Sequence, residues 1–277
     1  MAVPILYAVS VLLLGLAAWA SLHYYRTLEE THDQKAGNWL ACALLVQTAF
    51  IAAQWFETGY PPLLTLSGIL MVITFSLGVV LWMGRLKAPV PLLTSLFMPL
   101  VFFLALMGFS VQFKDSVFPN PSLMTIWMAF HIFSIFLGFA CFTLGFGVGL
   151  AFWIQEGQLK RHQVKAWSFR LPSLELLDRL TVFFIGWGFL FWAVGLVLGT
   201  YQAFLVWHKL PLGDPKILGA FLVLIIYAGF FLARWGFKIR GRKTMVWVIG
   251  GYFLALFTFV GVQVFLQTQH LFWKSVP

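Results

Sequence analysis

Charged side chains are scarce in this chain of 277 residues. They make up 10% of the sequence, whereas 61% is hydrophobic and 18% is aromatic. A water-soluble domain of this length needs a polar surface and cannot bury so large an apolar fraction in its core. The composition therefore excludes an ordinary soluble protein and favours a chain whose solvent is lipid.

Cysteine is scarce as well, with Cys42 and Cys141 each inside an apolar run. The sequence has no CxxC, no CxxCH and no paired spacing, so a disulfide framework, a zinc site and covalent haem attachment are unsupported. We expect both cysteines to be small buried side chains. A Walker A motif, a glycine-rich nucleotide loop and a Ser/His/Asp arrangement are also missing, and we do not expect an enzyme.

Long apolar runs dominate the chain instead. Several reach or exceed the roughly 20 residues that a helix needs to cross a bilayer. The runs do not alternate apolar and polar residues as a membrane barrel does. The first is too long and apolar for a cleaved signal. The sequence predicts an all-α integral membrane protein, a bundle of about eight transmembrane helices in one domain over 1–277, with no evident internal repeat. The predicted spans are 3–22, 39–56, 63–83, 92–110, 123–154, 181–207, 217–234 and 245–266.

Lysine and arginine are distributed unevenly between the two sides of this topology. The odd-numbered connections hold 14 of the 18 such residues. Because cytoplasmic loops carry the excess of positive residues, these connections are predicted to be cytoplasmic and both termini to be outside. Topology and anionic lipid then account for the net charge of +9 without nucleic acid. In the connection 155–180, we expect Ser173 to cap a short helix whose leucines lie on the membrane surface.

The histidines fall into two groups in this topology. His23, His32 and His162 lie near charged cytoplasmic loops, where we expect solvated side chains. The other three lie toward the outer side. Two imidazoles on different helices at one membrane face can ligate a haem iron axially. At each position a structural histidine remains the alternative. The outer histidines are His131, His208 and His270, and the aromatic residues beside them include Trp127, Phe130, Phe133, Phe272 and Trp273.

Other features of the spans indicate packing rather than transport. None of the polar residues noted within the spans is charged, which disfavours an ion-driven pump, and a small-molecule transporter is a weaker hypothesis. Small residues let helices approach closely. The glycines expected to do so are Gly138, Gly145, Gly147 and Gly149 in span five, and Gly186, Gly188, Gly195 and Gly199 in span six.

The second half of the chain, about residues 123–272, resembles the cytochrome c assembly membrane proteins of the CcsA and HemX type. Three pieces carry the resemblance: His131 with its helix, continuing through 147–160 (GVGLAFWIQEGQLK); residues 171–180 (LPSLELLDRL), which lead into the glycine-rich sixth span; and residues 257–262 (FTFVGV) with the trailing His270. The first half, with residues 59–63 (GYPPL), is similar only loosely.

The resemblance implies a protein of the bacterial inner membrane that handles haem b at its outer face for cytochrome c biogenesis or haem-pathway control. His131 and His270 match the family's two axial-ligand positions. The outer segment that covers haem in the family matches 207–216, where Trp207 would stack on the porphyrin and Lys209 or Lys216 would bind a propionate. Asp214 belongs to the Asp-Pro-Lys end of this segment, the part that matches the family motif. The implied partners are membrane lipid, haem and a cytochrome c maturation protein.

Two departures point to the HemX-like branch. Gln47 stands near where members that also hold haem within the membrane tend to have a histidine, and the repeated tryptophans of the outer segment are missing apart from Trp207. The alternative hypothesis, also implied by that branch, is a scaffold or regulator without its own haem, whose cytoplasmic connections 155–180 and 235–244 hold glutamyl-tRNA reductase.

Overall fold

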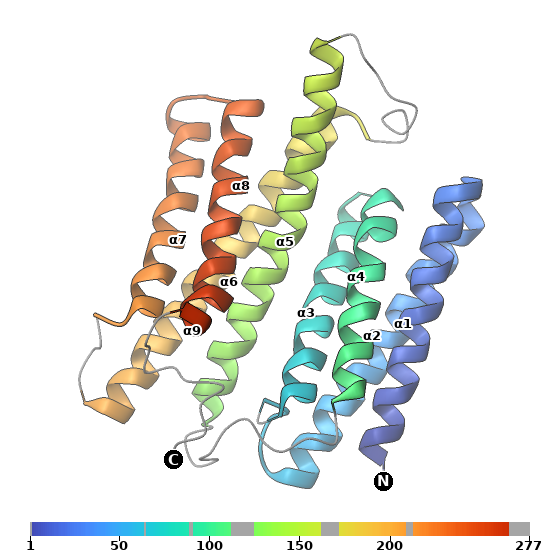
Figure 1. Ribbon diagram of the computed structural model, residues 1–277, viewed down its shortest axis with the longest axis vertical. Helices are drawn as coiled ribbons and strands as arrows, with labels where there is room; N and C mark the ends of the chain where they lie inside the picture. The colour runs from blue at the N-terminus through green and yellow to red at the C-terminus, as the bar shows by residue number, and fades with distance from the viewer. Residues whose placement is uncertain are drawn as a thin grey trace. The chain divides into compact units, whose positions relative to one another are not determined.

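The computed structural model describes residues 2–63, 65–88, 91–111, 125–161, 172–208 and 213–265. Within these ranges the regular structure is helical and contains no strand. Figure 1 shows the helices α1 (Ala2–Thr27), α2 (Glu30–Thr58), α3 (Leu66–Lys87), α4 (Pro91–Ser110), α5 (Ile126–Lys160), α6 (Leu174–Trp207), α7 (Pro215–Phe231), α8 (Arg242–Leu256) and α9 (Val262–Phe265). Two π-helical turns follow α7 and α8, at Leu232–Gly236 (η3) and Phe257–Gly261 (η4).

Seven helices in the described ranges, α1 to α6 and the segment Pro215–Gly236, are long and apolar enough to cross a membrane. The eighth expected span, 245–266, corresponds to the helical segment 242–265, which η4 divides. Large apolar side chains such as Leu12, Phe56 and Ile225 are exposed on these helices, which suits a lipid solvent and not water. The all-α membrane fold is confirmed, while the side on which the termini lie remains a prediction.

Several helices run beyond the apolar stretch that predicts them. Helix α2 begins at Glu30, well before residue 39, and Glu30 and Asp33 in its first turn are favourable at the positive end of the helix dipole. Ser173 does cap a helix, since its side chain accepts the N–H of Leu176 at 3.3 Å. That helix is α6 itself, so the expected separate surface helix is wrong, and Leu177 is buried rather than lying on the membrane.

The described helices fall into two compact units, one ending at Ala129 and the other beginning at Phe130. In the first unit α1 packs against α2 and α4, and α3 also packs against both. These four helices therefore form a closed bundle. The expectation of one domain over 1–277 is untested by this division and remains a prediction.

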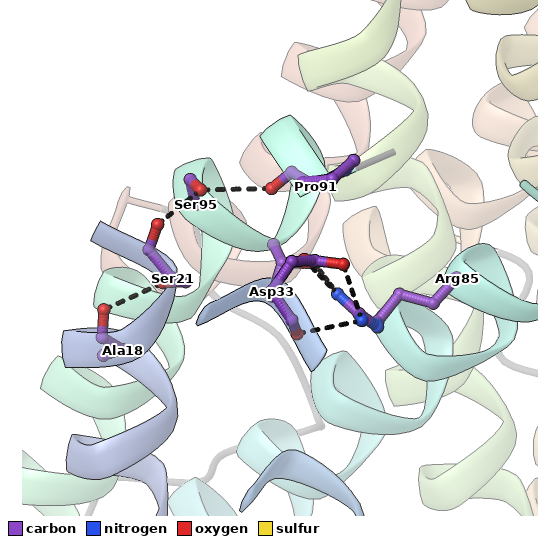
Figure 2. A network of polar contacts seen from close by, with 7 residues as sticks. Ala18, Ser21, Asp33, Arg85, Pro91 and Ser95 are labelled. Carbon is purple, nitrogen blue, oxygen red and sulfur yellow. Dashed lines mark hydrogen bonds and ion pairs between the residues drawn. The ribbon is translucent and has the colours of Figure 1, made fainter. Parts of the chain in front are cut away.

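Polar contacts join the helices of the first unit near the predicted cytoplasmic end (Figure 2). Arg85 at the end of α3 donates to the Asp33 carboxylate of α2 from both terminal guanidinium nitrogens, Nη1 and Nη2, at 2.6 Å and 2.9 Å. Its Nη1 also donates to the Thr94 hydroxyl of α4 at 3.0 Å. The Ser95 hydroxyl of α4 donates to the Ser21 carbonyl of α1 at 2.7 Å. Four helices are thus connected by hydrogen bonds within one layer.

The second unit has the same neighbour relations. Helix α6 packs against α7 and α7 against α8. Helix α5 contacts α6 so closely that a Cβ added to Gly138 would lie 3.0 Å from the Trp192 backbone nitrogen. On its other side α5 stacks Phe146 on Tyr252 of α8, with ring centroids 4.4 Å apart. The predicted packing role is confirmed for this glycine. Of the cysteines, Cys141 is buried as expected, whereas Cys42 is exposed.

The two units also repeat their polar links between the second and third helices. Arg234 in η3 donates to the Asp178 carboxylate of α6 from both terminal guanidinium nitrogens, as Arg85 does to Asp33. Farther along, Gln47 of α2 donates to the Thr74 hydroxyl of α3 at 3.2 Å. The matching contact is the indole of Trp192 of α6, which donates to the Ala220 carbonyl of α7 at 3.1 Å. Each unit thus joins its second and third helices by an arginine–aspartate pair and by a further side-chain hydrogen bond.

Candidate functional site

His131 is the predicted haem ligand whose surroundings the structure describes. It lies in the second turn of α5 and is half-buried against α6. Its Nδ1 is 2.6 Å from the backbone carbonyl oxygen of Gly195. Because a carbonyl oxygen only accepts hydrogen bonds, Nδ1 must carry the proton and donate. This contact fixes the ring orientation and makes Nε2 the nitrogen suited to bind a metal.

Two glycines of α6, one turn apart, make room for this imidazole. A Cβ on Gly199 would lie 2.5 Å from the His131 Cε1 and 2.6 Å from Nδ1, distances at which atoms collide. A Cβ on Gly195 would lie 2.8 Å from the Ile135 side chain, one turn farther along α5. The small residues therefore let the α6 backbone come close enough for its carbonyl to accept from the ring.

Aromatic side chains lie around the same end of α5. Trp127 and Phe130 are exposed, with 47% and 53% of their surface accessible, respectively. Large exposed rings beside a half-buried imidazole suit an apolar planar ligand such as a porphyrin. They also suit the membrane interface, where aromatic residues are common.

The Asp-Pro-Lys segment is the start of α7. Asp214 is the N-cap, and its Oδ1 accepts the backbone N–H of Lys216 at 2.8 Å. Pro215 occupies the first helical position, where the missing N–H has no consequence. The buried Asp214 therefore has a structural task in the helix start, and its predicted part in haem binding is untested.

The other predicted site residues are only partly described. His270 and Lys209 lie outside the described residues, and Trp207 is described only as the last residue of the α6 backbone. His208 follows it as the C-cap of α6, in a left-handed conformation and exposed to solvent. The pairing of His131 with His270 is therefore a prediction that the described residues do not test.

Comparison with known proteins identifies the family. The profile of the family described as cytochrome C assembly protein matches residues 8–270, nearly the whole chain. The chain belongs to this family.

Two relatives carry the names CcsA and HemX, the two types of protein that the sequence resembles. The cytochrome c biogenesis protein CcsA of Thermosynechococcus vestitus is 24% identical, covering 83% of this chain and 84% of its own length. Protein HemX of Bacillus subtilis is 25% identical, covering 78% of this chain and 80% of its own length. The two identities are nearly equal, so membership in the HemX-like branch continues to rest on the residues alone.

The structure describes the surroundings of Gln47 in α2. It is fully buried in α2, and its Nε2 donates to Thr74 of α3. Its Oε1 has no hydrogen-bond partner. The amide thus joins two helices of the first unit, which is a structural use of the position at which some members are expected to have a histidine.

Two features were missed from the sequence. The Gly195 carbonyl has no side chain to signal it, and a glycine in a span indicates close packing without naming the group that approaches. The second feature is a contact between His23 and His32, whose ring centroids are 4.3 Å apart. Both were expected to be solvated, yet both are half-buried, and the prediction is wrong because the turn between α1 and α2 folds one ring onto the other.

Proposed function

We propose that this member of the cytochrome c assembly family binds haem at the outer membrane face for cytochrome c biogenesis, with His131 and His270 as axial ligands. The observation that carries the proposal is the hydrogen bond from His131 Nδ1 to the Gly195 carbonyl. An axial histidine in haem proteins is held in this way, because the bond fixes the tautomer and raises the basicity of Nε2. Membership in the cytochrome c assembly family supports haem as the ligand.

The chain's own residues would then have distinct tasks. His131 and His270 would hold the iron, and the exposed rings of Trp127 and Phe130 would contact the macrocycle. The positive charge of Lys209 or Lys216 would pair with the propionates, and Trp207 would stack on the porphyrin. Bound haem would thereby be positioned for transfer to an apocytochrome. The covalent attachment would take place between the haem and the apocytochrome, without a reacting group from this chain.

The experiment is a visible spectrum with pyridine haemochrome analysis of the purified chain. We compare the wild type with His131→Ala, His270→Ala and the double variant. His32→Ala is the control, because that imidazole lies in the first turn of α2, on the side predicted to be cytoplasmic. The proposal predicts a Soret band with haem b stoichiometry in the wild type and the control, strongly reduced in the single variants and lost in the double variant. A wild type without haem, or a double variant with undiminished haem, contradicts it.

A further inference from the structure

The turn between α1 and α2 brings together polar and aromatic side chains that haem binding at the outer face does not use. His23 lies in the last turns of α1 and His32 in the first turn of α2. Their rings meet edge to face, with centroids 4.3 Å apart and planes at 70°. Trp19, one turn before His23, stacks on it with centroids 5.4 Å apart and planes at 15°. The three rings form a cluster within the first unit.

The two nitrogens of His32 are in different situations. Nε2 is 3.3 Å from the Glu29 carboxylate, and Nδ1 is buried without a hydrogen-bond partner. An ionised carboxylate has no proton to donate, so this ion-pair contact favours a proton on Nε2. In the neutral ring, Nδ1 then holds a buried lone pair that nothing satisfies. A water molecule or an ion commonly completes a buried polar atom of this kind.

This arrangement is the one that metal-binding histidines show. A ligating imidazole characteristically donates its other N–H to a carboxylate, which orients the ring and strengthens the lone pair at the metal. Glu29 has this place relative to His32. The neighbouring Asp33 carboxylate does not take this place beside His32, because Arg85 binds both Asp33 oxygens.

We propose that His23 and His32 bind one divalent first-row transition-metal ion, with His32 Nδ1 and the His23 imidazole as protein ligands and Glu29 as the carboxylate that orients His32. Imidazole ligands suit zinc, cobalt, nickel and copper. Within the described residues no group of three or more histidine, cysteine or acidic side chains is placed to hold a metal. The site therefore has two protein ligands, and water completes its coordination.

The ring spacing agrees with one small ion and disagrees with haem. With metal–nitrogen distances of about 2.1 Å, the ring centroids of two imidazoles on one ion lie about 4.6 Å apart when the two metal–nitrogen bonds meet at 90°, and about 5.3 Å apart at the tetrahedral angle. The two rings, 4.3 Å apart, would have to move apart by about 0.3 to 1 Å to hold the ion between them. Imidazoles on opposite faces of a porphyrin would have centroids about 6 Å apart. The metal proposal uses neither His131 nor His270, so it does not depend on the proposed haem site.

The experiment titrates the metal-stripped, haem-free full chain in detergent with Co²⁺, followed by calorimetry and visible absorption. The proposal predicts one tight Co²⁺ per chain. His23→Ala and His32→Ala are each expected to weaken this binding at least tenfold, and Glu29→Gln by about tenfold, the usual loss when a carboxylate partner of a ligand is removed. His208→Ala is the control and is expected to leave the affinity unchanged.

X-ray absorption on the Zn²⁺-loaded wild type keeps the proposal testable if a variant fails to fold. The expected result is scattering from two imidazoles at about 2.0 to 2.1 Å. Fewer imidazoles, no stoichiometric ion in the wild type, or equal Co²⁺ affinity in the His23→Ala/His32→Ala variant overturns the proposal. Haem binding provides an independent readout, since that double variant is expected to keep the wild-type Soret band.

Discussion

Replacing Gly199 by alanine tests how α6 holds the His131 ring. The new Cβ would lie 2.5 Å from the His131 Cε1 and 2.6 Å from Nδ1. Ordinary van der Waals contacts begin at roughly 3.4 Å, so the ring must move by about 1 Å in a close-packed interface. A ring displaced by that amount can no longer make its 2.6 Å hydrogen bond to the Gly195 carbonyl.

The magnitude follows from three terms. Overpacking costs about 1 to 3 kcal/mol, and loss of the hydrogen bond costs about 1 kcal/mol more. Alanine returns about 1 kcal/mol through its better helix propensity. Gly199→Ala is therefore expected to destabilise the fold by about 1 to 3 kcal/mol. It is also expected to weaken haem binding by about 10- to 100-fold, the range seen when the partner of a metal ligand is lost.

The assay is thermal unfolding in detergent together with a haemin titration at the Soret band. Gly250→Ala is the matched control, because Gly250 lies within α8 and a Cβ there meets nothing within 4 Å. It is expected to raise stability slightly and leave haem affinity unchanged. A Gly199→Ala protein as stable as the control and equal to the wild type in haem affinity would refute the reasoning.

Three further predictions concern the polar links. Asp33→Asn leaves the half-buried Arg85 without its bidentate partner and is expected to destabilise the fold by about 2 to 4 kcal/mol. A double-mutant cycle with Arg85→Gln, measured by unfolding in detergent, should show strong coupling between the two residues, and additive losses of stability would contradict this. Asp214→Ala is expected to lower the stability by about 1 kcal/mol, and Asp214→Asn only a little, since asparagine also caps helices. A stable Asp214→Asn protein that loses haem would assign this residue to the haem site. Trp192→Phe removes the hydrogen bond to the Ala220 carbonyl and is expected to lower the stability by about 1 to 3 kcal/mol in the same unfolding assay. An unchanged unfolding midpoint would show that this hydrogen bond contributes nothing to stability.

The membrane fold was predictable because hydrophobic length is a local property of the sequence. The ends of the helices were less predictable, because the backbone hydrogen bonds of a helix continue until a cap or a turn residue ends them. Helix α6 shows both effects: Ser173 was recognisable as a cap, but the sequence did not reveal that the helix runs unbroken from there into the span.

The ion pairs and the histidine contact were not predictable for a different reason. Asp33 and Arg85 are 52 residues apart, and Asp178 and Arg234 are 56 apart. Counting positive residues to assign sidedness treats arginine as a solvated charge and ignores such partners. The contact with His23 depends on the turn after α1, where Leu28 takes a positive φ of 61°. No residue pattern in this stretch announces that turn.

The proposed haem site was predictable in part. His131 could be chosen because its position on a long span, near the side predicted to be outside, is visible in the sequence and agrees with the family resemblance. The groups that hold its ring could not, since one is a backbone carbonyl and the other is the missing Cβ of Gly199.

The most direct test of the account is the axial ligation of the iron, measured by near-infrared magnetic circular dichroism on the ferric haem-loaded chain. The account predicts the signature of two imidazole nitrogens in the wild type and its loss in both His131→Ala and His270→Ala. A wild-type spectrum from a different pair of ligands, or an unchanged bis-imidazole spectrum in either variant, would contradict it.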